Sequence, residues 1–422
     1  MAVLDSGKRR VWIAGAGISG IIAALRLLRL GHSVTIWQTP GFSYKAIEST
    51  QSASCRILEE LDALDCLSEC DSYIADGLCY FERSALAKRL SLKARESGVV
   101  ICDSAEMPRG WDAHCDALID ATGRAATYSG SVRRYGREVA DFYEIPAAEA
   151  YLGRQVISEE TFWAYRMGTR CAATAAVIAR HKQNLAQIAE DALFKLDVDV
   201  STACYVGRRF CSPQWTERPL ELNRISVGDA AFAYYPLAGM GVRFAITTAI
   251  AAVAVLQTRW FRPEITKVAD EYYHELCEAA RVSHLTNLAG ASTARRVSDT
   301  EPLVFTAKEV EGGVLRGDYI VPEKTYLLSD GSRVRWLGSI DLAQLRRLSS
   351  IPISRGTLTE RLRKGFSTRT DAQRLVDWCV QHRVLSPLIE VQECGYVLAS
   401  RANEPSTAKP TMRWALPPSI FE

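Results

Sequence analysis

Three glycines near the start of the chain stand where an apolar segment changes into a helical pattern. They are Gly15, Gly17 and Gly20, which follow residues 10–14 and precede residues 21–30, where apolar side chains recur at helical spacing. In such a turn the first glycine permits the tight bend, the second lets backbone amides approach a pyrophosphate, and the third lets helix and strand pack closely. Because the helix N-terminus also favours an anion, the pattern predicts a dinucleotide site.

A second apolar segment, residues 31–38, follows at the distance expected for the next strand and ends in Gln38. An acid at this position usually accepts hydrogen bonds from the adenosine ribose. Gln38 can bind a hydroxyl as a neutral group, so we expect it to contact the ribose.

Another glycine-rich turn follows an apolar segment that begins at Ile225. An Asp ends the strand, a Pro begins the turn, and two glycines lead into a helix of small residues. This arrangement would place backbone amides and a helix N-terminus against an anionic or polar ring. The residues that we expect at the cofactor here are Gly228, Asp229, Pro236, Gly239, Met240 and Gly241.

Shorter patterns predict the elements around these turns. Residues 45–61 are typical of a loop that leads into a helix, and residues 99–102 and 115–120 of strands. Ser84 is placed to cap a helix that begins beside it. The strand at 115–120 runs into a glycine turn at 120–123, which we expect at the edge of the dinucleotide site.

The composition is that of a chain with two or three domains. Its 422 residues are 48% hydrophobic, and a net charge of +2 argues against global attraction to nucleic acid. The first residues contain no apolar stretch long enough for a signal peptide, so we expect a cytoplasmic protein. The apolar segment 245–256 is too short, between Arg243 and Arg259, to span a bilayer, so we expect a buried helix and no membrane contact.

Twelve cysteines occur without a CxxC pair, which is typical of reduced thiols. Cys66 and Cys70 could share a helix face, but two thiols without further ligands make a poor metal site, so we expect no metal. His181 and His284 are candidate bases, although a lone histidine is more often structural. The sequence therefore leaves the catalytic residue unknown.

Together the motifs resemble flavoprotein monooxygenases of the aromatic hydroxylase and tryptophan halogenase superfamily, whose second motif reads GDAAHxxxPxxGxGxN. Residues 228–243 match it with Phe232 for His and Arg243 for Asn, and two further family patterns occur at 82–86 and 120–123. The resemblance covers about residues 8–285. It implies FAD, NAD(P)H as reductant, and hydroxylation of an aromatic ring through a C4a-hydroperoxyflavin. It also implies that Asp229 contacts the ribityl chain, that residues 236–241 lie along the isoalloxazine ring, and that Arg83 lies near the cofactor.

Halogenation is disfavoured within that superfamily. The halogenases use an active-site lysine, whereas this chain has none from Ala46 to Ala87, and their WxWxIP motif is absent, with residues 162–166 in its place. The expected fold is α/β: a Rossmann-like FAD-binding domain of the GR2 type at 1–140 and 207–300, and a substrate-binding sheet domain at 141–206. Aromatic residues could line a pocket on that sheet, although they are more often core: Tyr143, Phe162, Trp163 and Tyr165.

The last part of the chain differs from a typical member of that superfamily. After a connector at 301–334, helical patterns begin at Asp341, Thr357 and Asp371, and two strands are expected at 388–391 and 396–399, before an extended tail at 401–422. This order resembles a winged-helix-like α+β domain at 335–400, as in DNA-binding proteins and in peptide-chaperone domains of modifying enzymes. Between Arg333 and Arg383 the chain has eleven basic and four acidic residues, so the domain could bind phosphates or an acidic peptide, or simply be a solvated surface.

A monooxygenase with such an added domain resembles the flavoproteins of tryptophylquinone biogenesis, which hydroxylate a tryptophan in the precursor of quinohemoprotein amine dehydrogenase. The resemblance implies a polypeptide substrate that the C-terminal domain could dock, and makes nucleic acid a less favoured partner. Two alternatives stay open: a hydroxylase or halogenase of a small natural product, and a flavin-linked DNA-binding regulator.

Overall fold

Two compact units make up the chain, unit 1 (Met1–Phe261) and unit 2 (Arg262–Glu422). The computed structural model describes residues 7–39, 46–68, 70, 72–75, 78–103, 107–146, 153–180, 185–236, 239–288, 298–328, 333–337, 340–363 and 369–388. The expected tail, Lys45, His181 and nearly all of the strand pair expected at 388–399 lie outside these residues.

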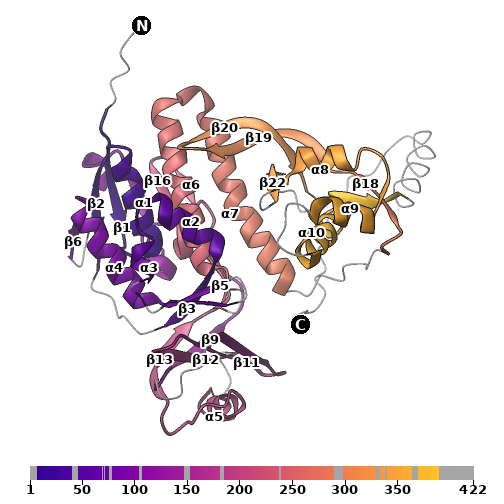
Figure 1. Ribbon diagram of the computed structural model, residues 1–422. Helices are drawn as coiled ribbons and strands as arrows, with labels where there is room; N and C mark the ends of the chain where they lie inside the picture. The colour runs from indigo at the N-terminus through magenta and orange to yellow at the C-terminus, as the bar shows by residue number, and fades with distance from the viewer. Residues whose placement is uncertain are drawn as a thin grey trace, which may run out of the picture. The chain divides into compact units, whose positions relative to one another are not determined.

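A six-stranded sheet forms the centre of unit 1 (Figure 1). Its strands lie in the order β15-β16-β7-β1-β2-β6, and all neighbours except β15 and β16 run parallel. The strands are β1 (Arg10–Ala14), β2 (Ser33–Trp37), β6 (Val100–Cys102), β7 (Ala117–Asp120), β15 (Leu220–Glu221) and β16 (Arg224–Ser226). The strands predicted in these segments are confirmed, because apolar runs are typical of parallel strands covered on both faces.

Two long helices pack together in unit 1, α1 (Ile18–Arg29) and α6 (Gly241–Phe261). Nine of the twelve residues of α1 are buried. Among the described residues, α6 alone is long and apolar enough to cross a membrane, but 72% of its apolar window is buried. The prediction of a buried helix is therefore confirmed, whereas the predicted length is wrong, because the helix continues past Arg243 and Arg259 at both ends. The other helices near this sheet are α2 (Ser52–Glu60), α3 (Asp65–Ser68), α4 (Arg83–Glu96), and the short 3-10 turns η1 (Trp111–Ala113), η2 (Gly123–Ala125) and η4 (Gly228–Ala230).

The expected cap of α4 is wrong. The helix begins at Arg83, so Glu82 is the N-cap residue and Ser84 lies inside the first turn, with its hydroxyl on the Glu82 carboxylate. The reason is that strand β5 (Leu78–Glu82) runs directly into the helix and leaves no loop for a separate cap.

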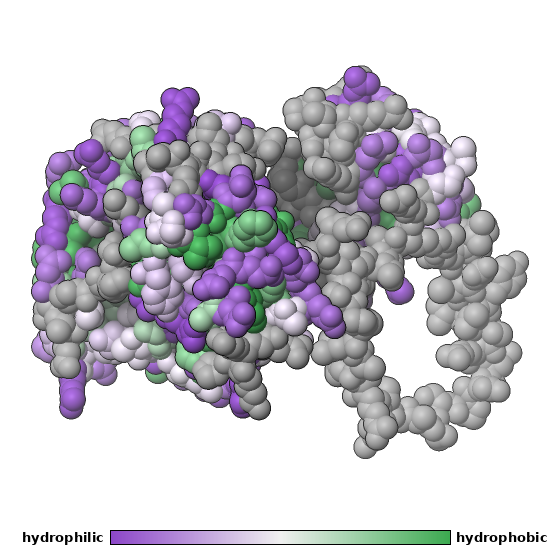
Figure 2. Space-filling model, turned by 90° about the horizontal axis from the view of Figure 1, so that it is seen from below, coloured by the Kyte–Doolittle hydropathy of each residue, from purple (hydrophilic) through white to green (hydrophobic). Residues whose placement is uncertain are grey.

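A five-stranded antiparallel sheet forms the second layer of unit 1, in the order β10-β11-β12-β9-β13. Helix α5 (Leu185–Lys195) packs on one of its faces, where the apolar core of this part lies (Figure 1). Seen from below in Figure 2, unit 1 shows hydrophobic residues in green among hydrophilic ones in purple. The strands are β9 (Glu138–Ile145), β10 (Gly153–Ser158), β11 (Phe162–Gly168), β12 (Ala173–Arg180) and β13 (Cys204–Phe210).

Two small sheets complete unit 1. The first has the order β3-β5-β4 and the second the order β17-β14-β8. Their strands are β3 (Ile47–Gln51), β4 (Tyr73–Ala75), β5 (Leu78–Glu82), β8 (Val132–Arg134), β14 (Gln214–Thr216) and β17 (Phe232–Ala233).

Unit 2 begins with the turn η6 (Pro263–Ile265) and α7 (Thr266–Leu288), which packs on the hairpin of β19 (Lys308–Arg316) and β20 (Tyr319–Leu327). The expected FAD-binding domain extended to residue 300, whereas α7 clusters with unit 2. The Glu-Gly-Gly segment within the expected connector is part of β19. A side chain at Gly313 would stand 2.7 Å from the Cβ of Tyr272, so glycine lets the hairpin approach α7 closely.

The described residues in the rest of unit 2 form three helices and short strands. The helices are α8 (Leu342–Leu348), α9 (Arg355–Arg363) and α10 (Arg369–Gln381), and their expected positions are confirmed. A sheet of order β24-β18-β25 shares their apolar core. The short strands of this part, including the three of that sheet, are β18 (Pro302–Phe305), β21 (Arg333–Val334), β22 (Trp336–Leu337), β23 (Ile340–Asp341), β24 (Ile353–Ser354) and β25 (Leu385–Pro387).

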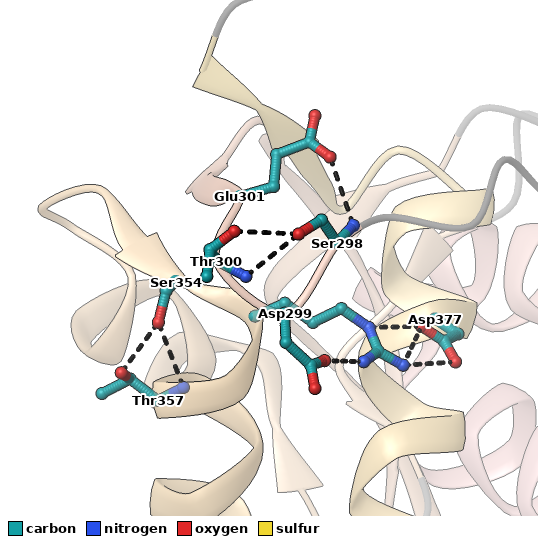
Figure 3. A network of polar contacts seen from close by, with 8 residues as sticks. Ser298, Asp299, Thr300, Glu301, Ser354, Thr357 and Asp377 are labelled. Atoms are coloured by element: carbon teal, nitrogen blue, oxygen red, sulfur yellow. Dashed lines mark hydrogen bonds and ion pairs between the residues drawn. The ribbon is translucent and has the colours of Figure 1, made fainter.

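An arginine at the start of α9 ties these elements together (Figure 3). The guanidinium of Arg355 bonds the carboxylate of Asp377 on α10 at 2.9 Å and also pairs with Asp299. Its side chain is 13% exposed. Ser354 accepts a hydrogen bond from the Thr357 amide and so caps α9.

Candidate functional site

The first glycine turn is shaped by close backbone packing. Gly15 has a φ of +103°, and a side chain there would collide with the carbonyl of Ala121. A side chain at Gly20 would collide with the carbonyl of Gly15, whereas nothing stands within 4 Å of the position that a side chain at Gly17 would take. Gly15 and Gly20 are therefore required by packing, and Gly17 keeps the N-terminus of α1 open.

That open end faces a cavity of about 800 Å³ in unit 1. The cavity lies between the glycine turns and the face of the five-stranded sheet opposite α5. It brings together six of the residues predicted for a cofactor, namely Gly17, Arg83, Asp229, Pro236, Gly239 and Gly241.

Asp229 reaches the cavity from the short turn η4, which is fixed on two sides. The amide of Gly228 donates to the hydroxyl of Thr248 on α6 at 2.8 Å. A side chain at Gly228, whose φ is +58°, would stand 2.9 Å from the hydroxyl of Ser19 on α1. The hydrogen bond to Thr248 holds the turn that carries Asp229, and glycine at 228 lets this turn approach α1 closely.

A buried acid shapes the turn that follows β7. Asp120 is fully buried, and its carboxylate accepts hydrogen bonds from the amide and hydroxyl of Thr122, from the Tyr128 amide and from the Ser129 hydroxyl, at 2.6 to 3.0 Å. The turn at 121–123 lines the cavity, as predicted for the edge of the site. Asp120 therefore does not line the cavity itself but fixes the turn that does.

Arg83 forms an ion pair with Glu48 at 3.0 Å, and both residues line the cavity. Gln38 and Met240 lie outside the cavity lining. The amide of Gln38 donates to the carbonyl of Cys102 at 2.9 Å, which extends the pairing of β2 with β6. The carbonyl of Met240 accepts from the Phe244 amide in the first turn of α6.

The alternation of side chains along β11 separates the predicted aromatic residues. Phe162 and Tyr143 pack on the α5 side, whereas Tyr165 lines the cavity with Met167. Trp163 shares the face of Tyr165 but lies outside the lining. Sequence reasoning missed further lining residues, which the tertiary structure brings to the cavity from strands β9 and β13 and from the loop after β17: Phe142, Phe210, Tyr234 and Tyr235.

The ionisable groups of the lining include few that could act as a base near neutral pH. Burial raises the pKa of the Cys211 thiol to about 12 and raises the pKa of the Tyr235 hydroxyl, so both stay protonated. The described lining includes no histidine, and His284 lies buried in unit 2. Among the described residues, no group of three or more His, Cys, Asp and Glu side chains could hold a metal ion.

Phe232, which replaces the histidine of the resembled motif, is fully buried. Its ring packs edge-on against Tyr234 at 4.7 Å and against Phe244 at 6.0 Å. Phe232 therefore supports the second glycine turn by packing in the core.

This fold is that of flavin-dependent halogenases and monooxygenases, whose solved structures superpose on most of the chain. No protein-family model matches the sequence, and no curated protein matches it. The peptidyl tryptophan dihydroxylase QhpG, essential for tryptophylquinone cofactor biogenesis, aligns with a TM-score of 0.62 at 19% identity, over 89% of this chain and 99% of QhpG. The flavin-dependent halogenase CmlS aligns with a TM-score of 0.66 at 15% identity, over 90% of this chain and 96% of CmlS. Aklavinone-11 hydroxylase, solved with FAD and aklavinone, aligns with a TM-score of 0.53 at 16% identity, over 67% and 68% of the two chains.

Proposed function

We propose that this protein is an FAD-dependent monooxygenase that hydroxylates an aromatic ring. The observation that carries the proposal is one cavity that joins the N-terminus of α1 to the aromatic wall of the five-stranded sheet. Cofactor and substrate can therefore meet in one cavity.

The residues of the cavity fit FAD. The open turn at Gly17 and the N-terminus of α1 would hold the pyrophosphate, and Asp229 would accept a hydrogen bond from a ribityl hydroxyl. The second glycine turn, including Gly239 and Gly241, would face the ring system. When bound, FAD would supply the activation of oxygen, with electrons from NAD(P)H.

The chain's own residues would position the substrate and exclude water. Phe142, Tyr165 and Met167 form an apolar wall that could hold a flat ring. With the hydroxyl of Tyr235 and the thiol of Cys211 held protonated, these groups can donate hydrogen bonds but not remove protons near neutral pH. The proposed role of the protein is therefore orientation and shielding of the ring.

We propose that the aromatic ring that is hydroxylated is a tryptophan side chain in a polypeptide precursor, as in tryptophylquinone biogenesis. The likeness to QhpG, which acts on a peptidyl tryptophan, supports this, because an alignment over 89% of the chain extends beyond unit 1 into unit 2. Unit 2 would dock the polypeptide through a winged-helix-like arrangement of α8, α9 and α10.

The likeness to CmlS supports a second candidate, a halogenase or hydroxylase of a small molecule, because it covers an equal share of the chain. The described lining of the cavity includes no lysine, although halogenases of the resembled superfamily use one. A DNA-binding role is less favoured, because acids from outside the basic segment pair with several of its arginines. Glu309 pairs with Arg346, and Glu275 with Arg333 at 3.2 Å.

The test has two parts. The purified protein should be yellow and release FAD on denaturation. Incubated with a flavin reductant, oxygen and tryptophan-containing precursor peptides, it should add oxygen to the peptide, which mass spectrometry detects. A colourless protein that takes up no FAD would contradict the proposal, and addition of chlorine or bromine in the presence of halide would favour the second candidate.

A further inference from the structure

One wall of the cavity is positively charged. The elements from β8 to β14 contribute three arginines to the described lining and no acid: Arg134, Arg154 and Arg209. The acids of the described lining, Glu48 and Asp229, come from the segments on the FAD side, and Glu48 pairs with Arg83.

Strand alternation directs these arginines into the cavity. Arg154 on β10 stands opposite Met167 on β11, and Met167 also lines the cavity. Neighbouring arginines on the same strands point to the other face, where acids pair with them: Arg208 bonds Asp141 at 2.7 and 2.8 Å, and Arg133 bonds Glu217 at 2.6 Å. Strand alternation thus separates the arginines of the two faces and places Arg134, Arg154 and Arg209 at the cavity.

Contacts with neighbours position the cavity arginines. The guanidinium of Arg154 stands 3.7 Å from where a side chain at Gly239 would begin, so it lies beside the second glycine turn. The guanidinium of Arg134 lies over the ring of Phe210 at 5.9 Å and donates to the side-chain oxygen of Gln214 at 3.3 Å. Gln214 is buried, and its side-chain amide donates to the carbonyl of Arg124 at 2.7 Å. This bond fixes the orientation of the Gln214 side-chain oxygen that Arg134 contacts.

We propose that the aromatic substrate carries a carboxylate close to its ring, and that Arg134, Arg154 and Arg209 recognise this carboxylate. A guanidinium can bind a carboxylate through two parallel hydrogen bonds, and nearby apolar walls strengthen such a contact. The carboxylate belongs either to a free aromatic acid or to an acidic residue beside the aromatic residue of a polypeptide. The inference rests on the proposed function, because it assigns the arginine wall to the substrate.

The test compares acids with their amides on the full-length, FAD-loaded protein. Indolepropionate and indolepropionamide form one pair of probes, and a peptide with Glu on both sides of Trp forms the other with its Gln analogue. Titration followed by the flavin absorbance should show the acid of at least one pair bound about tenfold more tightly than its amide. A preference only in the first pair would indicate a free acid, and one in the peptide pair a polypeptide.

The variants Arg134→Gln, Arg154→Gln and Arg209→Gln should each reduce the preference, and the triple variant should abolish it. Arg133→Gln is the matched control, because this exposed arginine on the same strand as Arg134 points away from the cavity and should leave the preference intact. Flavin content should be unchanged in all five variants, which separates this test from that of the proposed function.

Three results would overturn the inference while leaving FAD binding intact. The first is equal binding of acid and amide in both pairs, or no binding of either acid at millimolar concentration. The second is a preference that survives the triple variant. The third is a loss of NADPH affinity in the arginine variants without any change in the preference, which would assign the arginines to the reductant.

Discussion

At the scale of single residues, the site depends on glycines whose surroundings leave no room for a side chain and on the position of one acid, Asp229. Gly15 and Gly20 are packed against backbone carbonyls, whereas Gly17 opens to the cavity. Asp229 lies on a turn that is hydrogen-bonded to Thr248 on α6 and approaches Ser19 on α1 closely at Gly228. The two kinds of position predict different consequences of substitution.

Replacing Gly15 with valine should empty the protein of flavin. The residue has a positive φ, and the new side chain would collide with the carbonyl of Ala121, so the turn must move away from the pyrophosphate position. The measurement is the ratio of flavin to protein absorbance after purification. Gly31→Ala serves as the control, because Gly31 also has a positive φ but has open space around it. Full flavin occupancy in the valine variant would remove the turn from the binding site.

Asp229→Ala should weaken flavin binding by about 1–3 kcal/mol, the cost of removing one hydrogen-bond partner of a buried group. The variant should still fold, because alanine fits a wall position at the cavity. Fluorescence titration of the flavin-free protein with FAD gives the dissociation constant. An unchanged constant would show that Asp229 does not contact the cofactor.

At the scale of elements, α9 is held both by its buried leucines, Leu358 and Leu362, and by polar contacts of its first residues. Arg355 links the start of α9 to α10 and to the segment before β18, and Ser354 caps the helix (Figure 3). Elements that are distant in sequence are thus fixed by one mostly buried side chain.

Arg355→Met should therefore destabilise unit 2 by about 1–3 kcal/mol, because it leaves two acids without their partner. The larger cost of breaking a fully buried pair does not apply, since the side chains of Asp299 and Asp377 are about half exposed. The free energy of unfolding from denaturant titration measures the loss. Arg361→Met on the same helix is the control, and an equal loss in both variants would show that the network contributes nothing specific.

At the scale of the whole molecule, the described part of the candidate cofactor site belongs to unit 1. Every described lining residue of the cavity precedes Phe261, where the two compact units divide. A truncation at Arg335 would cut through the core of unit 2, because β18 pairs with both β24 and β25. A cut after Phe261 respects the division.

Removing unit 2 at that point should leave the flavin spectrum and NAD(P)H oxidation largely intact and should sharply reduce hydroxylation of a polypeptide. The reason is that the cofactor residues remain while the proposed docking unit is lost. Turnover of the truncated protein should be compared on a precursor polypeptide and on free indole. Equal loss on both would make unit 2 a structural support, and undiminished turnover of the polypeptide would end the docking proposal.

Charge reversal on α9 tests docking in the intact chain. Arg361→Glu and Arg363→Glu should weaken capture of an acidic precursor in a salt-dependent way, because exposed charges act over a Debye length of about 8–10 Å. Binding of the precursor should be measured at low and at physiological ionic strength. A loss that is independent of salt would argue for a disturbed fold.

The sequence by itself determined the local elements and their chemistry. The glycine spacings at 15–20 and 228–241 predicted turns that the structure contains, and apolar runs predicted the parallel strands, because both signals depend on neighbouring residues only. Only the tertiary structure placed Gly17, Asp229 and Gly239 on one cavity, since its walls come from segments more than 200 residues apart. Strand register, which no local pattern fixes, placed Tyr165 on the cavity face and Tyr143 on the α5 face of the sheet, and lined the cavity with arginines. The tertiary structure also reduces the excess of positive charge that the sequence shows between Arg333 and Arg383. Arg355 and Arg346 pair there with acids from outside this segment.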